Sequence, residues 1–209
     1  DSLMNFEADS TFGAAIVFRT ERRIMRLEEE FEECYILLSQ VRDSTEILVK
    51  KFENIPDILP ILDWEVENIG ASVGEKIHPF YKKLVYHDGL DLIVPMGTDV
   101  VATADGVVKT LKRSKKLQGT HIVIDHGNGY RTVYAHLSDV YVREGKRVKK
   151  GELIARVGNS GTSFAPHLHY GIIKDSISLD PLSFVASTVD TQTYYNMLSV
   201  SINTGQSLD

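Results

Sequence analysis

The sequence predicts a mainly β fold, in which an antiparallel β-sandwich or barrel-like domain is preceded by a helical N-terminal segment, formed as a coiled coil or a hairpin. Three observations predict it. Apolar residues recur at alternating spacings of three and four over residues 20–53, short apolar runs punctuated by glycine begin near residue 70, and Asn128-Gly129 separates two of these runs. The first pattern is helical, and the other two are typical of strands joined by tight turns.

The helical pattern over residues 20–53 forms one long seam of a/d positions. Its members are Ile24, Leu27, Phe31, Cys34, Leu38, Val41, Thr45, Leu48 and Phe52. A seam of this length needs a partner, which predicts either a homodimer through this helix or pairing with residues 5–18. Cys34, the one cysteine of the chain, lies on the seam and is expected to be a small buried residue. Pro56 and Pro60 end the helix, because proline has no amide hydrogen to donate.

The β pattern consists of short apolar runs that we predict to be strands. They cover residues 99–110, 121–125, 130–136, 152–157 and 167–173. Because no helical pattern separates them, the strands are expected to pair antiparallel. Asn128-Gly129 predicts a type I′ hairpin, which needs a positive φ at both central positions. We therefore divide the chain into a helical segment, a β domain and a C-terminal tail, over residues 1–62, 63–186 and 187–209. Within the tail, a short helix is expected around Tyr194 to Ser199.

Composition excludes some classes of protein. The net charge of -6 gives no reason to expect nucleic-acid binding, which favours a basic face. Two basic clusters, at residues 112–116 and 143–150, are expected to be solvated hairpin tips. No apolar run approaches the roughly 18 residues of a membrane span. The chain begins with Asp1, so we expect any signal or membrane tether of the native protein to lie outside these residues.

Three groups of residues carry chemistry. In His87-Asp88-Gly89-Leu90-Asp91, the histidine and the last aspartate can converge if the glycine lets the backbone turn sharply. His167 and His169 share one face of a predicted strand, too far apart to bind one ion closely together unless the strand bends. His136 ends another strand. Imidazole and carboxylate suit zinc, and three ligands with two further histidines beside an open position are typical of a catalytic zinc site.

Further motifs occur in a fixed order around these residues. They are Ala102-Thr103-Ala104-Asp105-Gly106-Val107-Val108, Asp125-His126-Gly127-Asn128-Gly129-Tyr130, Tyr134-Ala135-His136-Leu137, and the run from Val148 to Gly161. With the histidine motifs, the stretch from about residue 68 to 185 resembles the LytM/lysostaphin-type zinc metallopeptidase family. The resemblance implies one Zn²⁺ per chain, held by His87, Asp91 and His169, with His136 and His167 as the catalytic pair.

The resemblance also implies a function. It implies a zinc-dependent metalloendopeptidase that hydrolyses the peptide cross-links of bacterial peptidoglycan with a metal-activated water, its peptide stems lying extended in a groove. The expected location is the cell envelope, either periplasmic or membrane-anchored and facing the periplasm. One of His136 and His167 would act as general base and the other would stabilise the oxyanion. The pattern leaves open which histidine does which.

The chain departs from the family pattern at two places. The family usually has an acidic residue where Gly171 follows Tyr170, and often an arginine where Lys76 precedes Ile77-His78-Pro79. We expect both departures to affect the groove and not metal binding. The remaining histidines, His78, His121 and His126, are expected to be structural or groove residues.

Two other functions are compatible with parts of this sequence. A catalytically silent LytM-type module would bind the cell wall or regulate another wall hydrolase, but such modules have typically lost ligands, and all five positions are intact here. The segment from Gly145 to Ala155 suggests a second alternative, a biotin- or lipoyl-type carrier domain. That class is disfavoured, because a carrier needs a lysine exposed at a turn between two strands, and the sequence has no Met-Lys-Met-like or Asp-Lys-Ala-like turn.

Overall fold

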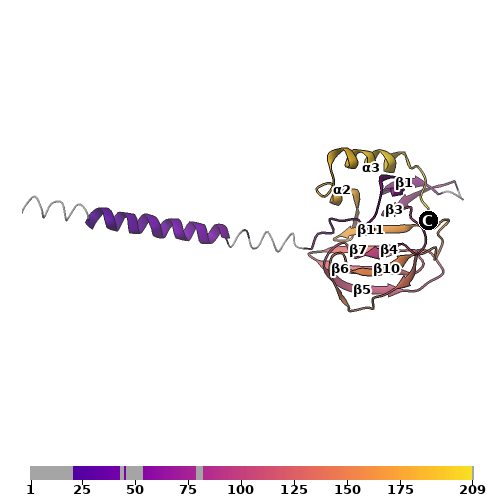
Figure 1. Ribbon diagram of the computed structural model, residues 1–209, viewed down its shortest axis with the longest axis horizontal. Coiled ribbons are helices and arrows are strands. Elements are labelled where there is room, and N and C mark those ends of the chain that lie inside the picture. The colour runs from indigo at the N-terminus through magenta and orange to yellow at the C-terminus, as the bar shows by residue number, and fades with distance from the viewer. Residues whose placement is uncertain (1–20, 43–44, 46–53, 79–81, 209) are drawn as a thin grey trace, which may run out of the picture. The chain divides into compact units, whose positions relative to one another are not determined.

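The chain divides into two units, Asp1–Phe52 and Glu53–Asp209, and each is described by itself. A computed structural model describes residues 21–42, 45, 54–78 and 82–208 (Figure 1). Within this described part of the chain, no helix combines the length and the apolar character that crossing a membrane requires.

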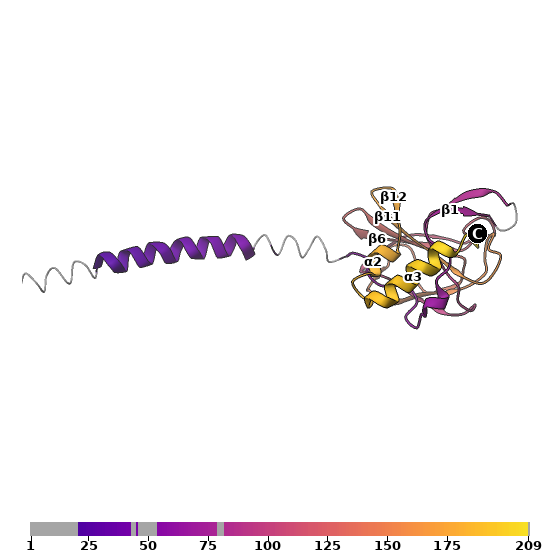
Figure 2. The same cartoon turned by 90° about the horizontal axis from the view of Figure 1, so that it is seen from above.

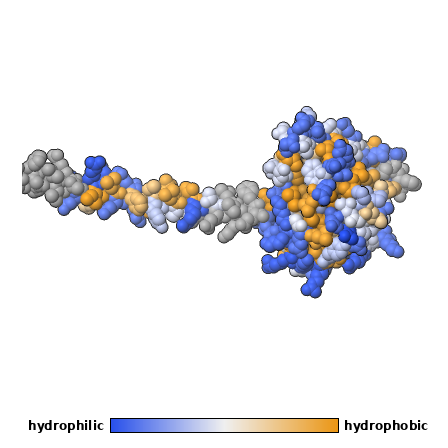
Figure 3. Space-filling model, in the orientation of Figure 1, coloured by the Kyte–Doolittle hydropathy of each residue, from blue (hydrophilic) through white to orange (hydrophobic). Residues whose placement is uncertain are grey.

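The first unit contains a helix over residues 21–42. This confirms part of the predicted helix; the rest, apart from residue 45, and the partner segment at residues 5–18 lie outside the described residues. Apolar side chains stand exposed along the helix (Figure 3), with Phe31 73% and Leu38 63% accessible. Cys34 is also exposed, so the prediction of a buried cysteine is wrong for the single chain. The homodimer stays a prediction.

The second unit is built mainly of antiparallel strands. A short 3-10 helix, η1 (Val66–Asn68), precedes them, and α2 (Leu182–Val185) and α3 (Thr191–Asn203) follow them. The strands are β1 (Gly74–Ile77), β2 (Leu84–His87), β3 (Leu90–Leu92), β4 (Asp99–Val101), β5 (Gly106–Lys112), β6 (His121–Gly127), β7 (Tyr130–Ala135), β8 (Leu137–Val140), β9 (Arg147–Val148), β10 (Leu153–Val157), β11 (Leu168–Lys174) and β12 (Ile177–Leu179).

The strands form three sheets. The largest has the order β12-β11-β7-β6-β5-β9, and β3 also pairs with β11; β4-β10-β8 forms a second sheet and β1-β2 a separate hairpin. One cluster of buried apolar side chains draws on the two larger sheets and both C-terminal helices, including Ile122, Ile154, Leu182 and Met197. In Figures 1 and 2, α2 and α3 lie on the side of the domain where β11 lies. The mainly β, antiparallel fold predicted from the sequence is confirmed.

The predicted strand over residues 99–110 is wrong, because the segment contains two strands that belong to different sheets. β4 pairs with β10, whereas β5 pairs with β6 and β9. At the start of β5, a Cβ on Gly106 would lie 2.7 Å from the carbonyl oxygen of Asp125, so only glycine allows this close approach. The apolar run crosses from one sheet to the other without a break in hydrophobicity.

The predicted hairpin at Asn128-Gly129 is confirmed. Asn128 has a φ of 49° and Gly129 a φ of 79°, which are the positive values that a type I′ turn requires. The turn joins β6 to β7, with Gly127 opposite Tyr130. It therefore fixes the register of β7, the strand that leads into His136.

The helix expected around Tyr194 to Ser199 extends further in both directions, as α3. Asp190 caps it, its side chain accepting a hydrogen bond from the main-chain N–H of Thr193 at 3.0 Å. After α3, the chain returns to β1, where Ile77 forms a parallel bridge with Gln206.

A group of buried polar residues links β6, β7 and β11 inside the core. Nε2 of His126 lies 2.7 Å from Oγ1 of Thr132, which lies 3.1 Å from the hydroxyl of Tyr134. That hydroxyl accepts the main-chain N–H of Thr103 at 3.1 Å, and the hydroxyl of Tyr170 donates to Oγ1 of Thr103 at 2.9 Å. Burial lowers the pKa of His126. This is the structural role that the sequence predicts for His126.

We expect Tyr134→Phe to lower the free energy of unfolding by about 1–3 kcal/mol, because the buried N–H of Thr103 loses its acceptor. Tyr195→Phe removes a hydroxyl from a ring that is 70% exposed and serves as the control, with a change within about 0.5 kcal/mol. Urea denaturation of both variants measures the difference. Equal midpoints for Tyr134→Phe and the wild type would contradict the importance of this network.

Candidate metal centre

His87 and Asp91 come together through the turn between β2 and β3. His87 is the last residue of β2, and Asp91 is the middle residue of β3. Between them, a Cβ on Gly89 would lie 2.6 Å from the carbonyl oxygen of Tyr170 and 2.7 Å from Nε2 of His169. A side chain at this position would therefore push β11 away, and only glycine lets the turn pack against the strand that carries His169.

His169 reaches the same place through the pairing of β11. It lies opposite Asp91 of β3 on one side and opposite Ala135 of β7 on the other. Its neighbour Leu168 faces the other way and is completely buried in the core, as the alternation of a strand requires. The register thus places a histidine, an aspartate and the residue before His136 next to one another.

Three side-chain atoms converge here at nearly equal distances. Nε2 of His87 lies 3.0 Å from Oδ1 of Asp91 and 3.1 Å from Nδ1 of His169, and this Nδ1 lies 3.3 Å from Oδ1 of Asp91. A tetrahedral zinc ion with ligands at about 2.0 Å spaces its donor atoms about 3.3 Å apart. The triangle therefore has the size of one face of such a site, and these three residues form a candidate metal site.

The second nitrogen of each ligand histidine has its own acceptor. Nδ1 of His87 lies 3.0 Å from the carbonyl oxygen of Ser72, and Nε2 of His169 lies 3.2 Å from Oδ1 of Asp88. Because a carbonyl oxygen can only accept a hydrogen bond, a neutral His87 carries its proton on Nδ1 and presents a lone pair at Nε2. By the same argument, a neutral His169 carries its proton on Nε2, which faces the carboxylate of Asp88, and has its lone pair at Nδ1. Two lone pairs and a carboxylate facing one point fit a cation.

Asp91 is completely buried, yet it is held in its charged form. Burial by itself raises the pKa of a carboxyl group, but hydrogen bonds from the protonated rings of His169 and His87 outweigh it and hold the pKa of Asp91 well below its usual value. A cation bound between the three side chains would take the place of these ring protons. Its other oxygen, Oδ2, accepts the main-chain N–H of Leu208 at 3.0 Å. An ionised carboxylate in this position is what a metal ligand requires.

His136 and His167 lie next to the three candidate ligands. Their ring centroids are 4.7 Å apart, and the rings of His136 and His169 are 6.3 Å apart. Nε2 of His167 lies 3.7 Å from Oδ1 of Asp91. His136 has a φ of 59°, a left-handed conformation that is uncommon outside glycine and that concentrates at functional sites. All five residues named from the sequence are thus brought together.

The two additional histidines are oriented in the same way. Nδ1 of His136 lies 2.7 Å from the carbonyl oxygen of Ser160, and Nδ1 of His167 lies 2.9 Å from the carbonyl oxygen of Ala165. Each Nδ1 therefore carries a proton and donates it to the main chain. In the neutral ring this leaves Nε2 as the nitrogen that can accept a proton, which is the requirement for a general base.

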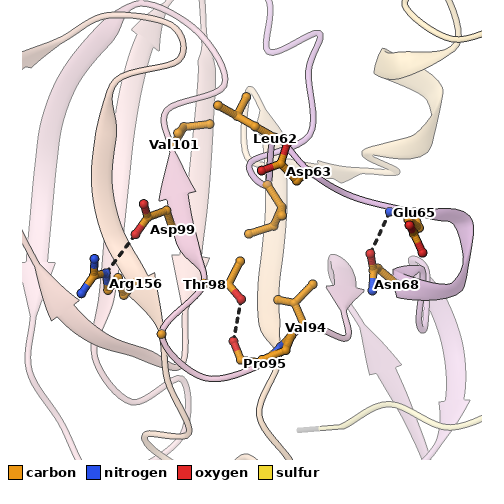
Figure 4. A pocket seen from close by; sticks show the side chains of 12 residues that line it. Leu62, Asp63, Glu65, Asn68, Val94, Pro95, Thr98, Asp99, Val101 and Arg156 are labelled. Carbon is orange, nitrogen blue, oxygen red and sulfur yellow. Dashed lines mark hydrogen bonds and ion pairs between the residues drawn. The ribbon is translucent and has the colours of Figure 1, made fainter.

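A cavity of about 360 Å³ opens beside the candidate centre. It is lined by His78, Val85, Tyr86, His87, Asp88, Leu117, Gln118, Thr162 and Ser207. His78 also packs edge-on against Phe164, with centroids 5.4 Å apart, which makes it a groove residue as expected. A larger cavity of about 610 Å³ (Figure 4) is lined by residues such as Asp63, Asn68 and Arg156 and by none of the five site residues.

Several residues that contact the five site residues were not predicted from the sequence. Asp88 belongs to the motif from His87 to Asp91. Its carboxylate, next to a candidate ligand histidine, is a signal from which its role could have been predicted. Ser72, Ser160 and Leu208 contribute main-chain atoms only, so no pattern of side chains points to them. His121 contacts the carbonyl oxygen of Gly119 through Nδ1 at 3.1 Å, outside the group of five.

Comparison with known proteins places the chain in a family. The model of Peptidase family M23 matches residues 85–181. Among curated proteins, the peptidoglycan DD-endopeptidase ShyA of Vibrio cholerae serotype O1 is 42% identical over 98 residues, which are 47% of this chain and 23% of ShyA. The chain spans about a quarter of the length of the curated relatives that it matches.

Solved structures agree with this match. A zinc containing peptidase from Vibrio cholerae has a TM-score of 0.51 and 29% identity, over 59% of this chain and 38% of that chain. The catalytic domain of lysostaphin from Staphylococcus simulans has a TM-score of 0.50 and 30% identity, over 57% of this chain and 94% of that domain. The segment that the family model matches contains all five site residues. The chain belongs to peptidase family M23, the LytM/lysostaphin-type metallopeptidases.

Proposed function

We propose that this chain is a zinc-dependent metalloendopeptidase of the bacterial cell envelope that hydrolyses peptide cross-links of peptidoglycan. The observation that carries the proposal is the triangle of donor atoms from His87, Asp91 and His169, with sides of 3.0 to 3.3 Å. Its size and its donor types suit zinc. The name of ShyA, a peptidoglycan DD-endopeptidase, supports the substrate, and the zinc containing peptidase from Vibrio cholerae supports the metal.

The proposed ligand set leaves a position open for chemistry. When bound, zinc supplies Lewis acidity, which polarises the scissile carbonyl and lowers the pKa of a water molecule. Two neutral histidines and one carboxylate leave a net positive charge on the site. Ser72 and Asp88, by fixing the proton positions on His87 and His169, keep both ligands in the form that binds a metal.

His136 and His167 would move the protons of the reaction. In the proposed step, the water oxygen bonds to the carbonyl carbon, and its proton passes to Nε2 of one of these histidines. The C–N bond then breaks, and the same histidine gives this proton to the leaving amine. The second histidine, with Nε2 protonated as well as Nδ1, would donate a hydrogen bond to the oxyanion that forms on the carbonyl. The two rings stand 4.7 Å apart, close enough to serve one substrate bond.

The substrate would lie in the cavity beside the centre. Tyr86 and Leu117 border it and are 65% and 75% exposed. Exposed apolar side chains at the edge of a cavity suit the apolar parts of an extended peptide stem, and polar groups such as Gln118 suit its amides.

Metal content tests the three candidate ligands. We expect the purified protein to hold one equivalent of zinc, and Asp91→Ala or His169→Ala to lose it, because two ligands do not retain the ion against dialysis. His121→Ala, a histidine outside the group of five, is the matched control and should keep its zinc. Metal content after dialysis is measured by mass spectrometry. A full equivalent of zinc in either ligand variant would refute the assignment.

Substitution of His136 tests its role in proton transfer. We expect His136→Asn to keep zinc and to lose hydrolysis by roughly 100-fold or more, the usual size of a general acid–base contribution. Asparagine tolerates the left-handed backbone of His136, and its amide can still donate to the carbonyl oxygen of Ser160. The rate is measured on a cross-linked muropeptide, alongside zinc content. An unchanged rate would remove His136 from the mechanism.

Digestion of purified sacculi tests the reaction itself. We expect the zinc-loaded protein to convert cross-linked muropeptide dimers of purified sacculi to monomers, and a chelator to stop the conversion. Products are resolved by mass, which also identifies the bond that is cut. Protein that binds one equivalent of zinc but releases no monomers would instead favour the silent module that binds the wall or regulates another hydrolase.

A further inference from the structure

Residues 204–208, which we call the strap, run from the end of α3 back to the metal centre. On one side, the main-chain N–H of Ile77 in β1 donates to the carbonyl oxygen of Gly205 at 2.8 Å. On the other side, the N–H of Phe164 donates to the carbonyl oxygen of Leu208 at 3.0 Å. Figures 1 and 2 both show the C-terminal end close to β1. The strap therefore bridges the β1 hairpin and the segment before His167.

The strap contacts a candidate ligand directly. The main-chain N–H of Leu208 donates to Oδ2 of Asp91 at 3.0 Å. Oδ1 of the same carboxylate belongs to the triangle with His87 and His169. The two oxygens of Asp91 thus have separate partners, and the strap binds the one outside the triangle.

A buried cation anchors the start of the strap. The side chain of Lys76 is almost completely buried, and Nζ donates to the carbonyl oxygens of Ser201 and Thr204, each at 3.2 Å. These carbonyls belong to the C-terminal end of α3, where a positive charge is favourable. The anchor fixes the point at which the chain leaves the helix, so the position of the strap is set at both ends.

We infer that the strap is a positioning element for the metal ligand Asp91. A carboxylate can bind a metal through one oxygen or through both. By holding Oδ2, the N–H of Leu208 keeps Asp91 bound through Oδ1 alone and in the orientation that the triangle requires, because partners of a ligand fix its geometry. This inference rests on the proposed zinc site.

The strap forms a wall of the cavity and does not fill it. Ser207, which is buried, lines the cavity of about 360 Å³ together with His78, Tyr86 and Thr162. Space for a substrate therefore remains beside the strap. An inhibitory segment would instead have to occupy that space, and its loss would raise the activity.

The test removes the hydrogen bond and keeps the rest of the strap. Leu208→Pro deletes the N–H but retains the carbonyl that binds Phe164, and Leu208→Ala keeps the N–H and changes only the side chain. Zinc affinity is measured by competition with a chromophoric chelator. We expect roughly 10-fold to 100-fold weaker binding for Leu208→Pro, the usual effect of losing a ligand's partner, and an affinity close to the wild-type value for Leu208→Ala.

A second readout reports the coordination itself. In the cobalt-substituted protein, a change of Asp91 from one bound oxygen to two raises the coordination number and weakens the visible absorption bands. We expect this change in Leu208→Pro and in a variant that lacks residues 206–209, whereas Leu208→Ala should keep the wild-type spectrum. Because the spectrum comes from the metal site, a general loss of stability does not imitate it.

The outcomes separate the two proposals. If the wild type binds no zinc, the proposed function fails and the strap inference fails with it. If the wild type binds zinc and Leu208→Pro has the same affinity and the same cobalt spectrum, only the strap inference is overturned. Higher peptidase activity after removal of residues 206–209 would also overturn it, because the strap would then be an inhibitor.

Discussion

The pairing of β11 with β3 and β7 is the constraint on which the candidate centre depends. His169 lies opposite Asp91 in one neighbouring strand and opposite Ala135, the residue before His136, in the other. Directly opposite residues have Cβ atoms about 5 Å apart, so the ladder itself brings these side chains within reach. A slip of one residue would exchange His169 for Leu168 and place an apolar side chain at the centre.

The centre concentrates polar groups that are costly to bury, and the surrounding main chain offsets much of this cost. The four histidines and Asp91 are all at most 3% exposed. Carbonyl oxygens of Ser72, Ser160 and Ala165 satisfy one nitrogen each of three histidines. The left-handed backbone of His136 adds strain. Such local cost is expected where a fold holds a functional group in place.

The sequence pointed to five residues that the fold brings together, and it predicted most strands, because side-chain identity and spacing carry that information. The hairpin at Asn128-Gly129 is predictable because its backbone needs residues that tolerate a positive φ. The strand over residues 99–110 was not predicted correctly, since hydrophobicity does not record a change of sheet. The partner of Asp91 in the strap could not be found either, because the main-chain N–H of Leu208 is common to almost every residue type.

The two departures from the family pattern, Lys76 and Gly171, are not among the three candidate metal ligands. Where the family usually has an acidic residue, a Cβ on Gly171 would meet Val133 and the carbonyl oxygen of Asp88 only at ordinary distances of 3.6 and 3.7 Å, so space does not exclude a side chain there. The carboxylate that faces Nε2 of His169 comes from Asp88. Lys76, in place of the arginine, binds the end of α3. The fold therefore accommodates both departures without replacing any of the three candidate ligands.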